Sequence, residues 1–111
     1  MKIKMTKLYL DDERTPKGEG FIIVRDFTMF VTHIALSGMP DYISFDHDIA
    51  SYDEDGNELT GMDAAKFVVN WCINNNIKCP DFNVHSANPV GADNINSLLT
   101  NFKKHQELEG F

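Results

Sequence analysis

Acidic, histidine and serine side chains directly follow three short apolar runs of the sequence. They are Asp11 and Asp12 after residues 6–10, Asp46, His47 and Asp48 after residues 42–45, and His85 and Ser86 where residues 82–85 end. Carboxylate oxygens are common ligands of Mg²⁺ and Mn²⁺, and an imidazole can take up or release a proton near neutral pH. Clustered carboxylates repel one another unless a cation lies between them. If the three runs end at one place, these residues could bind a divalent metal and move protons beside it.

Three further residues could bind a phosphate group next to such a metal. Arg14 follows the first acidic pair, and a guanidinium forms strong charge-assisted hydrogen bonds with phosphate oxygens. Asn88 and Gly91 lie where a helix is predicted to begin at Pro89, and the free N–H groups of a helix start bind anions. Asn88 is also a good N-cap, and Arg14 could be an ordinary surface charge. Both alternatives remain open.

Short apolar runs and helical periodicity predict the elements that must position these residues. Four strands are expected, at residues 6–10, 21–24, 42–45 and 82–85. The apolar run 21–24 is continuous, which predicts a strand covered on both faces.

Three helices are expected, each with a recognisable start. The first begins after Asp26 and ends before Gly38, the second begins after Thr60 with Asp63 completing a capping box, and the third begins at Pro89. The acidic segment 51–60, which follows the third strand and precedes the second helix, is expected to be a turn or a lid. It does not match a calcium-binding loop, because Met62 occupies the position of the bidentate glutamate.

The alternation of strands and helices predicts a parallel sheet in a three-layer α/β fold. Residues 13–20, which join the first two strands, are too few for a crossover that includes a helix. Extended, they reach about 26 Å, which is enough to return along a strand of about 17 to 20 Å. We therefore expect a second strand parallel to the first, with an antiparallel edge strand as the alternative.

The expected strand order, 2-1-3-4, brings the acidic, histidine and serine residues that follow the strands to one edge of the sheet. In an open parallel sheet, ligands bind at the carboxyl ends of the strands where the strand order reverses, here between the first and third strands. Neighbouring strands are about 4.8 Å apart. Asp11, Asp12 and Asp46 are therefore the expected metal ligands.

Composition bounds the class of protein. The chain of 111 residues is expected to form a single domain, residues 1–111, with a net charge of −7. The excess of acidic side chains disfavours long nucleic acids as partners. No apolar run is long enough to span a membrane, and the first ten residues do not resemble a signal peptide, so a cytoplasmic location is expected. The oligomeric state does not follow from the sequence.

The motifs resemble two related kinds of domain. A strand ending in Asp11-Asp12, a second ending in Asp46 and a third ending in Ser86 resemble a response-regulator receiver domain, with its flavodoxin-like fold. This chain lacks the fifth strand with the phosphate-contacting lysine, and it lacks the first helix. The strings LYLDDER, ISFDHDI and VHSANPVG resemble the cyclic-phosphate-processing receiver domain family over nearly the whole chain. That resemblance implies a truncated receiver-like fold and a phosphoesterase acting on a cyclic phosphate.

The residues and the resemblance together favour a metal-dependent phosphoesterase for a small cyclic phosphate, such as a 2′,3′-cyclic nucleotide or RNA end. Mg²⁺ or Mn²⁺ would polarise the phosphoryl group. His85 and His47 are candidates for general base and general acid, Ser86 would hydrogen-bond the phosphoryl group, and Asp48 would orient His47 or complete the metal site.

Two other classes of function remain open. The chain could be a non-catalytic receiver-like module, either a phosphoacceptor at Asp46 or a protein that sequesters a cyclic nucleotide. Alternatively, Glu13 with Asp46 and Asp48 resembles the acidic triad of Toprim nucleases, although the absence of a basic groove disfavours a polymeric substrate.

Overall fold

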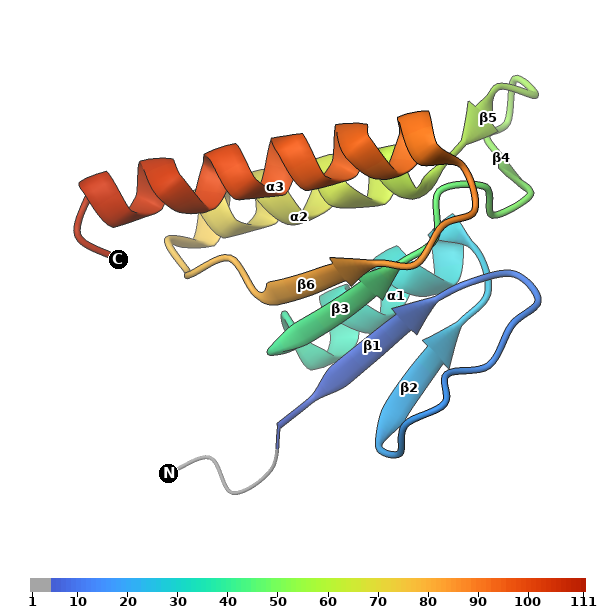
Figure 1. The fold of residues 1–111 in the computed structure, drawn as a ribbon, viewed down its shortest axis with the longest axis horizontal. Helices are drawn as coiled ribbons and strands as arrows, with labels where there is room; N and C mark the ends of the chain where they lie inside the picture. The colour runs from blue at the N-terminus through green and yellow to red at the C-terminus, as the bar shows by residue number, and fades with distance from the viewer. Residues whose placement is uncertain (1–4) are drawn as a thin grey trace.

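The computed structural model describes residues 5–111 and contains a four-stranded sheet with three helices (Figure 1). The elements are β1 (Lys7–Leu10), β2 (Phe21–Val24), α1 (Phe27–Ser37), β3 (Tyr42–Phe45), β4 (Ser51–Tyr52), β5 (Glu58–Leu59), α2 (Gly61–Asn75), β6 (Asp81–Val84) and α3 (Pro89–Leu108). The three helices lie where periodicity predicts them. The fourth long strand, β6, ends one residue earlier than expected, so His85 follows the strand.

The sheet has the order β2-β1-β3-β6, and every pair of neighbouring strands is parallel. This confirms the predicted order 2-1-3-4 and the direction of β2. The connection between β1 and β2 contains no helix, as its length requires. All four strands therefore point their carboxyl ends towards the same edge of the sheet (Figure 1).

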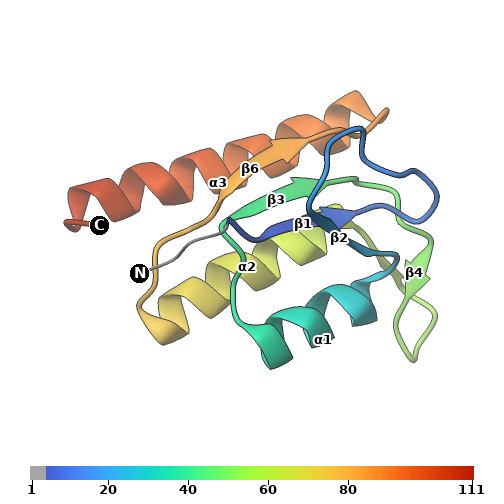
Figure 2. The same ribbon diagram turned by 90° about the horizontal axis from the view of Figure 1, so that it is seen from below.

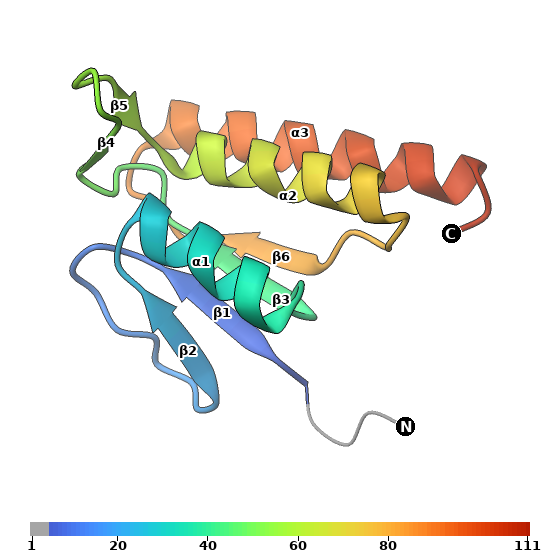
Figure 3. The ribbon, with the colours of Figure 1, turned by 180° about the vertical axis from the view of Figure 1, so that it is seen from behind.

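One continuous core joins the three helices to one face of the sheet. Leu8 and Leu10 of β1 and Ile43 and Phe45 of β3 are fully buried in it. The helices contribute Phe30, Ile34, Ala64, Ala65, Val68, Cys72, Ile95 and Leu99. α2 packs directly against both α1 and α3, and α3 also contacts β6. Figures 2 and 3 show this arrangement from below and from behind.

The other face of the sheet carries no helix within residues 5–111 (Figure 1). The expected third layer is represented there by the loop between β1 and β2, in which Gly18 lies beside the Phe21 ring. Aromatic side chains shield one another on this face: the Tyr9 ring makes an edge contact with Phe21, which in turn contacts Tyr42. The expectation that β2 is covered on both faces is wrong: β2 is an edge strand, and even on the helix side, where Ile22 pairs with Leu8, Ile22 is 43% exposed.

Each helix begins at a side chain that caps it. The Asp26 carboxylate accepts from the N–H of Met29, and Thr60 and Asp63 form the predicted capping box. α2 starts close to β3, because a Cβ on Gly61 would collide with the backbone carbonyl of Asp46. Only glycine permits this approach, so the first turn of α2 is held against the end of β3.

The segment 51–60 is more ordered than a simple turn. β4 and β5 form a small antiparallel hairpin in which Ser51 pairs with Leu59 and Tyr52 with Glu58. The Asp53 carboxylate accepts backbone N–H groups from Asp55 and Asn57 within its turn. These hydrogen bonds lower the pKa of Asp53. The lid function remains a prediction.

Candidate functional site

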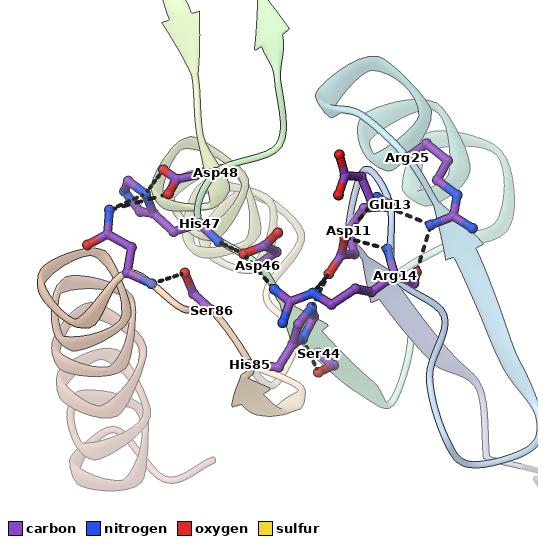
Figure 4. A network of polar contacts seen from close by, with 11 residues as sticks. Asp11, Glu13, Arg14, Arg25, Ser44, Asp46, His47, Asp48, His85 and Ser86 are labelled. Atoms are coloured by element: carbon purple, nitrogen blue, oxygen red, sulfur yellow. Dashed lines mark hydrogen bonds and ion pairs between the residues drawn. The ribbon is translucent and has the colours of Figure 1, made fainter.

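Three candidate site residues are aligned by backbone hydrogen bonds that extend the sheet one residue beyond the strands. The N–H groups of Asp11, Asp46 and His85 donate to carbonyl oxygens at the ends of neighbouring strands, at 3.2, 2.9 and 2.9 Å. The strands thus fix the backbone of all three residues at one edge of the sheet. Their side chains point towards one another (Figure 4).

A cavity of about 350 Å³ opens at this edge. Its walls are Asp11, Asp12, Glu13, Arg14, Asp46, Asp48, Ser86 and Ala87. The walls come from the ends of β1, β3 and β6, so the predicted convergence of the three strand ends is what forms the cavity. One arginine faces five acidic residues, so the walls carry an excess of negative charge.

Asp11 is the most constrained acid of the site, and its side chain is 1% exposed. Its Oδ1 accepts the N–H groups of Glu13 and Arg14, both at 2.9 Å. Its Oδ2 accepts from His85 Nε2 and from Arg14 Nε, both at 3.0 Å. Burial alone would raise the pKa of Asp11, but these hydrogen bonds and the Arg14 charge outweigh it and lower the pKa. Asp11 is therefore ionised at neutral pH.

Asp46 is also buried but has fewer partners. Its Oδ1 accepts the N–H of His47 at 2.8 Å and lies 3.5 Å from Arg14 Nη2. Burial, together with the neighbouring Asp11 carboxylate, raises the pKa of Asp46, and the His47 N–H and the Arg14 charge offset this only in part. The negative charge of Asp46 is thus less well compensated than that of Asp11.

His85 is held on three sides. Nε2 contacts Asp11, Nδ1 lies 2.7 Å from the hydroxyl of Ser44, and the ring stacks on Tyr9 with centroids 4.4 Å apart. Ser44 is 4% exposed, and a hydroxyl can either donate to or accept from the imidazole. Because the ionised Asp11 carboxylate can only accept, the proton lies on Nε2, and the Ser44 hydroxyl donates to Nδ1 when the ring is neutral.

Arg14 spans the two carboxylates of the cluster. Nε contacts Asp11 and Nη2 faces Asp46 (Figure 4). Its backbone is fixed too, because its N–H donates to Asp11 and its carbonyl accepts from Arg25 Nη1 at 2.7 Å. Burial would lower the pKa of Arg14, but the two carboxylates raise it, so the guanidinium stays charged.

His47 turns towards α3 instead of joining the cluster (Figure 4). Its Nδ1 lies 2.7 Å from Asp48 Oδ1 and 3.5 Å from Asn88 Nδ2. The ring packs so closely on Gly91 that a Cβ at that position would collide with it. Asn88 caps α3 by accepting the N–H of Gly91 at 3.0 Å, and its own N–H donates to Ser86 Oγ. The capping alternative for Asn88 is therefore the one that this geometry favours.

The expected site residues thus fall into groups. Asp11, Asp46 and Arg14 meet as expected, and His85 joins them as a neighbour of both carboxylates. Asp12, Asp48 and Ser86 line the same cavity, but Asp12 is outside the three-residue cluster. His47, Asn88 and Gly91 form an adjacent set at the start of α3. The metal, catalytic and phosphate-binding roles of these residues stay predictions.

Sequence reasoning missed two residues that support the site. Ser44 is a lone polar residue in an apolar strand, which is a signal that could have drawn attention to it. Arg25 directly follows β2, in line with Asp11 and Asp46 at the ends of the other strands. Its guanidinium donates to the carbonyls of Asp11 and Arg14 and so holds their loop in place.

The model of the cyclic-phosphate processing receiver domain family matches residues 6–101, which is most of the chain. The chain belongs to this family. The match spans all three strand ends that build the cavity and most of α3. A comparison with curated proteins gives no match, and neither does one with solved structures.

This cyclic-phosphate processing receiver domain has a donor set that suits a divalent metal. One oxygen each of Asp11 and Asp46 and one nitrogen of His85 lie within 4.8 Å of one another. Two carboxylates and an imidazole fit Mn²⁺ well, whereas Mg²⁺ prefers oxygen ligands alone. Ser44 would accept Nδ1–H of a metal-bound His85, as outer partners of metal-ligating histidines commonly do.

Proposed function

We propose that this domain is a metal-dependent phosphoesterase that opens a small cyclic phosphodiester, such as a 2′,3′-cyclic nucleotide or RNA end. The main support is the cluster of Asp11, Asp46 and His85 in a polar cavity beside Arg14. Family membership links the domain to cyclic-phosphate processing. Hydrolysis is our own inference from the residues of the cavity.

The three clustered residues would hold the metal, with Mn²⁺ favoured over Mg²⁺ because of the imidazole. When bound, such an ion polarises a phosphoryl oxygen and makes a hydroxide nucleophile available near neutral pH. Asp12 and Glu13 would add negative charge at the entrance of the cavity. This charge attracts a cation and repels a free anion, so the metal would bind first.

Two residues of the cavity would bind the phosphate. Arg14 carries the only positive charge in the walls, and Ser86 has a hydroxyl there. The N–H of Gly91 donates to the Asn88 side chain, and the backbone N–H of Asn88 donates to Ser86 Oγ. Asn88 and Gly91 would therefore hold the start of α3 and the position of Ser86 instead of contacting the anion.

His47 and Asp48 would handle the proton. The Asp48 carboxylate fixes His47 Nδ1 and leaves Nε2 to take up or release a proton. Asp48 itself lines the cavity, so it would link His47 to a phosphate bound there. His85 would be occupied by the metal and by Ser44, so of the two predicted histidines we favour His47 for proton transfer.

Turnover of a panel of cyclic phosphates tests this function. Nucleoside 2′,3′- and 3′,5′-cyclic phosphates and oligonucleotides with cyclic-phosphate ends would be incubated with Mn²⁺ or Mg²⁺, and the phosphomonoester product measured. We expect opening of at least one 2′,3′-cyclic substrate and loss of activity in Asp46→Asn. Asp93→Asn, the same change on the exposed surface of α3, is the matched control and should keep full activity. Folded, metal-loaded protein that opens none of these substrates would disprove the proposal.

A non-catalytic role is the second candidate, because Asp46 is buried at the position that resembles the phosphoacceptor of a receiver. The β6 strand lies at the edge of the sheet, and residues 5–111 contain no fifth parallel strand to carry the expected lysine. Intact-mass measurement after incubation with a small phosphodonor would detect a labile adduct of about 80 Da, absent in Asp46→Asn. Calorimetry that finds tight cyclic-nucleotide binding without product would indicate sequestration.

The Toprim-like alternative keeps some support, since Glu13, Asp46 and Asp48 all line the cavity. A single arginine beside them and a net charge of −7 disfavour a polymer as substrate. No helix among residues 5–111 is long and apolar enough to cross a membrane. We propose a small cyclic phosphate as partner and the cytoplasm as location.

A further inference from the structure

Arg14 lies where a metal ion would have to act. The candidate metal ligands are Asp11, Asp46 and His85, and Arg14 contacts both carboxylates, at 3.0 Å from Asp11 Oδ2 and 3.5 Å from Asp46 Oδ1. The same Asp11 oxygen also accepts from His85 Nε2. The guanidinium therefore neutralises the carboxylates in place of a metal.

The metal and the guanidinium compete for the same oxygens. A metal ligated by Asp11 Oδ2 and His85 Nε2 would displace the proton of Nε2 and bind the oxygen that Arg14 Nε now contacts. A divalent ion and a guanidinium between two carboxylates also repel each other strongly. We infer that this repulsion moves Arg14 away from at least one carboxylate when the metal enters.

The side chain of Arg14 is free to leave while its backbone is not. The side chain is 51% exposed. Its backbone N–H and carbonyl remain anchored to Asp11 and Arg25. The displaced guanidinium is thus tethered at the wall of the cavity and is available to a second, negatively charged ligand.

We propose that Arg14 couples the binding of metal and phosphate: it occupies the metal site when the site is empty, and metal binding releases it to bind an anion. This inference rests on the metal site of the proposed function and adds the order and cooperativity of binding. By thermodynamic reciprocity, an anion that draws Arg14 away must raise metal affinity by the same factor as the metal raises anion affinity.

Calorimetric titration with Mn²⁺, in the presence and absence of sulfate at constant ionic strength, tests the coupling. In the unmodified domain, sulfate should raise Mn²⁺ affinity. In Arg14→Gln, Mn²⁺ without sulfate should bind about 5- to 10-fold more tightly, and the effect of sulfate should vanish. Lys17→Gln removes a positive charge from the same loop at an exposed position, so it controls for long-range charge and should change affinity less than about twofold.

Unchanged or weaker Mn²⁺ binding by Arg14→Gln, or an equal sulfate effect in both proteins, would overturn the coupling. The coupling of metal and anion binding can be tested separately from the proposed reaction. Turnover of a cyclic phosphate without coupling would overturn this inference alone. Coupling without turnover of any substrate would overturn the proposed reaction and leave the role of Arg14 intact.

Discussion

The imidazole of His85 lies flat against the phenol ring of Tyr9, with planes 4° apart. Tyr9 belongs to the face of the sheet that no helix covers within residues 5–111, yet it is only 8% exposed. One stacked pair therefore joins the packing of the open face to the orientation of a site residue. We therefore expect changes at this contact to affect both the stability of the fold and the position of His85.

Replacement of the Tyr9 ring should destabilise the domain. Tyr9→Ala is expected to lower the free energy of unfolding by about 3 kcal/mol, because a large buried ring and its aromatic contacts are lost. Tyr9→Phe keeps the ring and should cost less than about 1 kcal/mol. Urea unfolding measures both values. Similar losses in the two variants would mean that the hydroxyl, and not the stack, carries the effect.

Ser44 should act on the metal through His85. Ser44→Ala leaves Nδ1 of His85 without its 2.7 Å partner, so Mn²⁺ affinity should fall about 10-fold while the fold is kept. Calorimetry measures the affinity, and Ser44→Thr, which restores a hydroxyl, should recover part of it. Ser97→Ala, an exposed serine of α3, should bind as the unmodified domain does. Full affinity in Ser44→Ala would exclude this role.

Asp46 and Asp11 should have opposite effects on stability. The pKa of Asp46 is raised in the folded state, so its contribution favours folding below the ordinary value of 3.8 and is lost as the pH rises through the folded pKa. The pKa of Asp11 is lowered, so its contribution favours folding above 3.8 and is lost as the pH falls through the folded pKa.

At pH 7 without metal, Asp46→Asn should therefore stabilise the domain, with a gain that disappears below the ordinary pKa of the carboxyl. Asp11→Asn should cost about 2 kcal/mol, because buried hydrogen bonds to a charged acceptor are weakened. Thermal unfolding from acidic to neutral pH measures both. Destabilisation by Asp46→Asn at neutral pH would contradict the uncompensated burial of its charge.

Gly91→Ala tests the place of His47. A Cβ at this position collides with the His47 ring, so the ring must move. The collision is offset in the free energy of unfolding because alanine has a higher helix propensity than glycine. The free energy of unfolding should stay within about 1 kcal/mol. Turnover of a cyclic phosphate should fall about tenfold or more, because the ring that would transfer the proton is displaced. Thr100→Ala, on the exposed surface of the same helix, is the control. Unchanged turnover in Gly91→Ala would remove His47 from proton transfer.

Much of the scaffold could be predicted because the signals are local. Capping by Thr60 and Asp63, the apolar runs of the strands and the short link after Arg14 depend on residues close in the chain. The hairpin of β4 and β5 was missed, since each strand has only two residues, too few to show the alternation that marks a strand. The open face of the sheet was missed as well, because coverage of a face depends on where distant helices pack.

The sequence by itself determined the strands and the carboxylates and histidines at their ends, and parallel strands must point the same ends towards one edge. Only the tertiary structure decided what each side chain contacts. It assigned His85 to Ser44 and Asp11, directed His47 towards α3, and placed Arg14 between Asp11 and Asp46. The physical reason is that a side chain's direction at the end of a strand depends on partners up to 74 positions away in the chain, which no local pattern encodes.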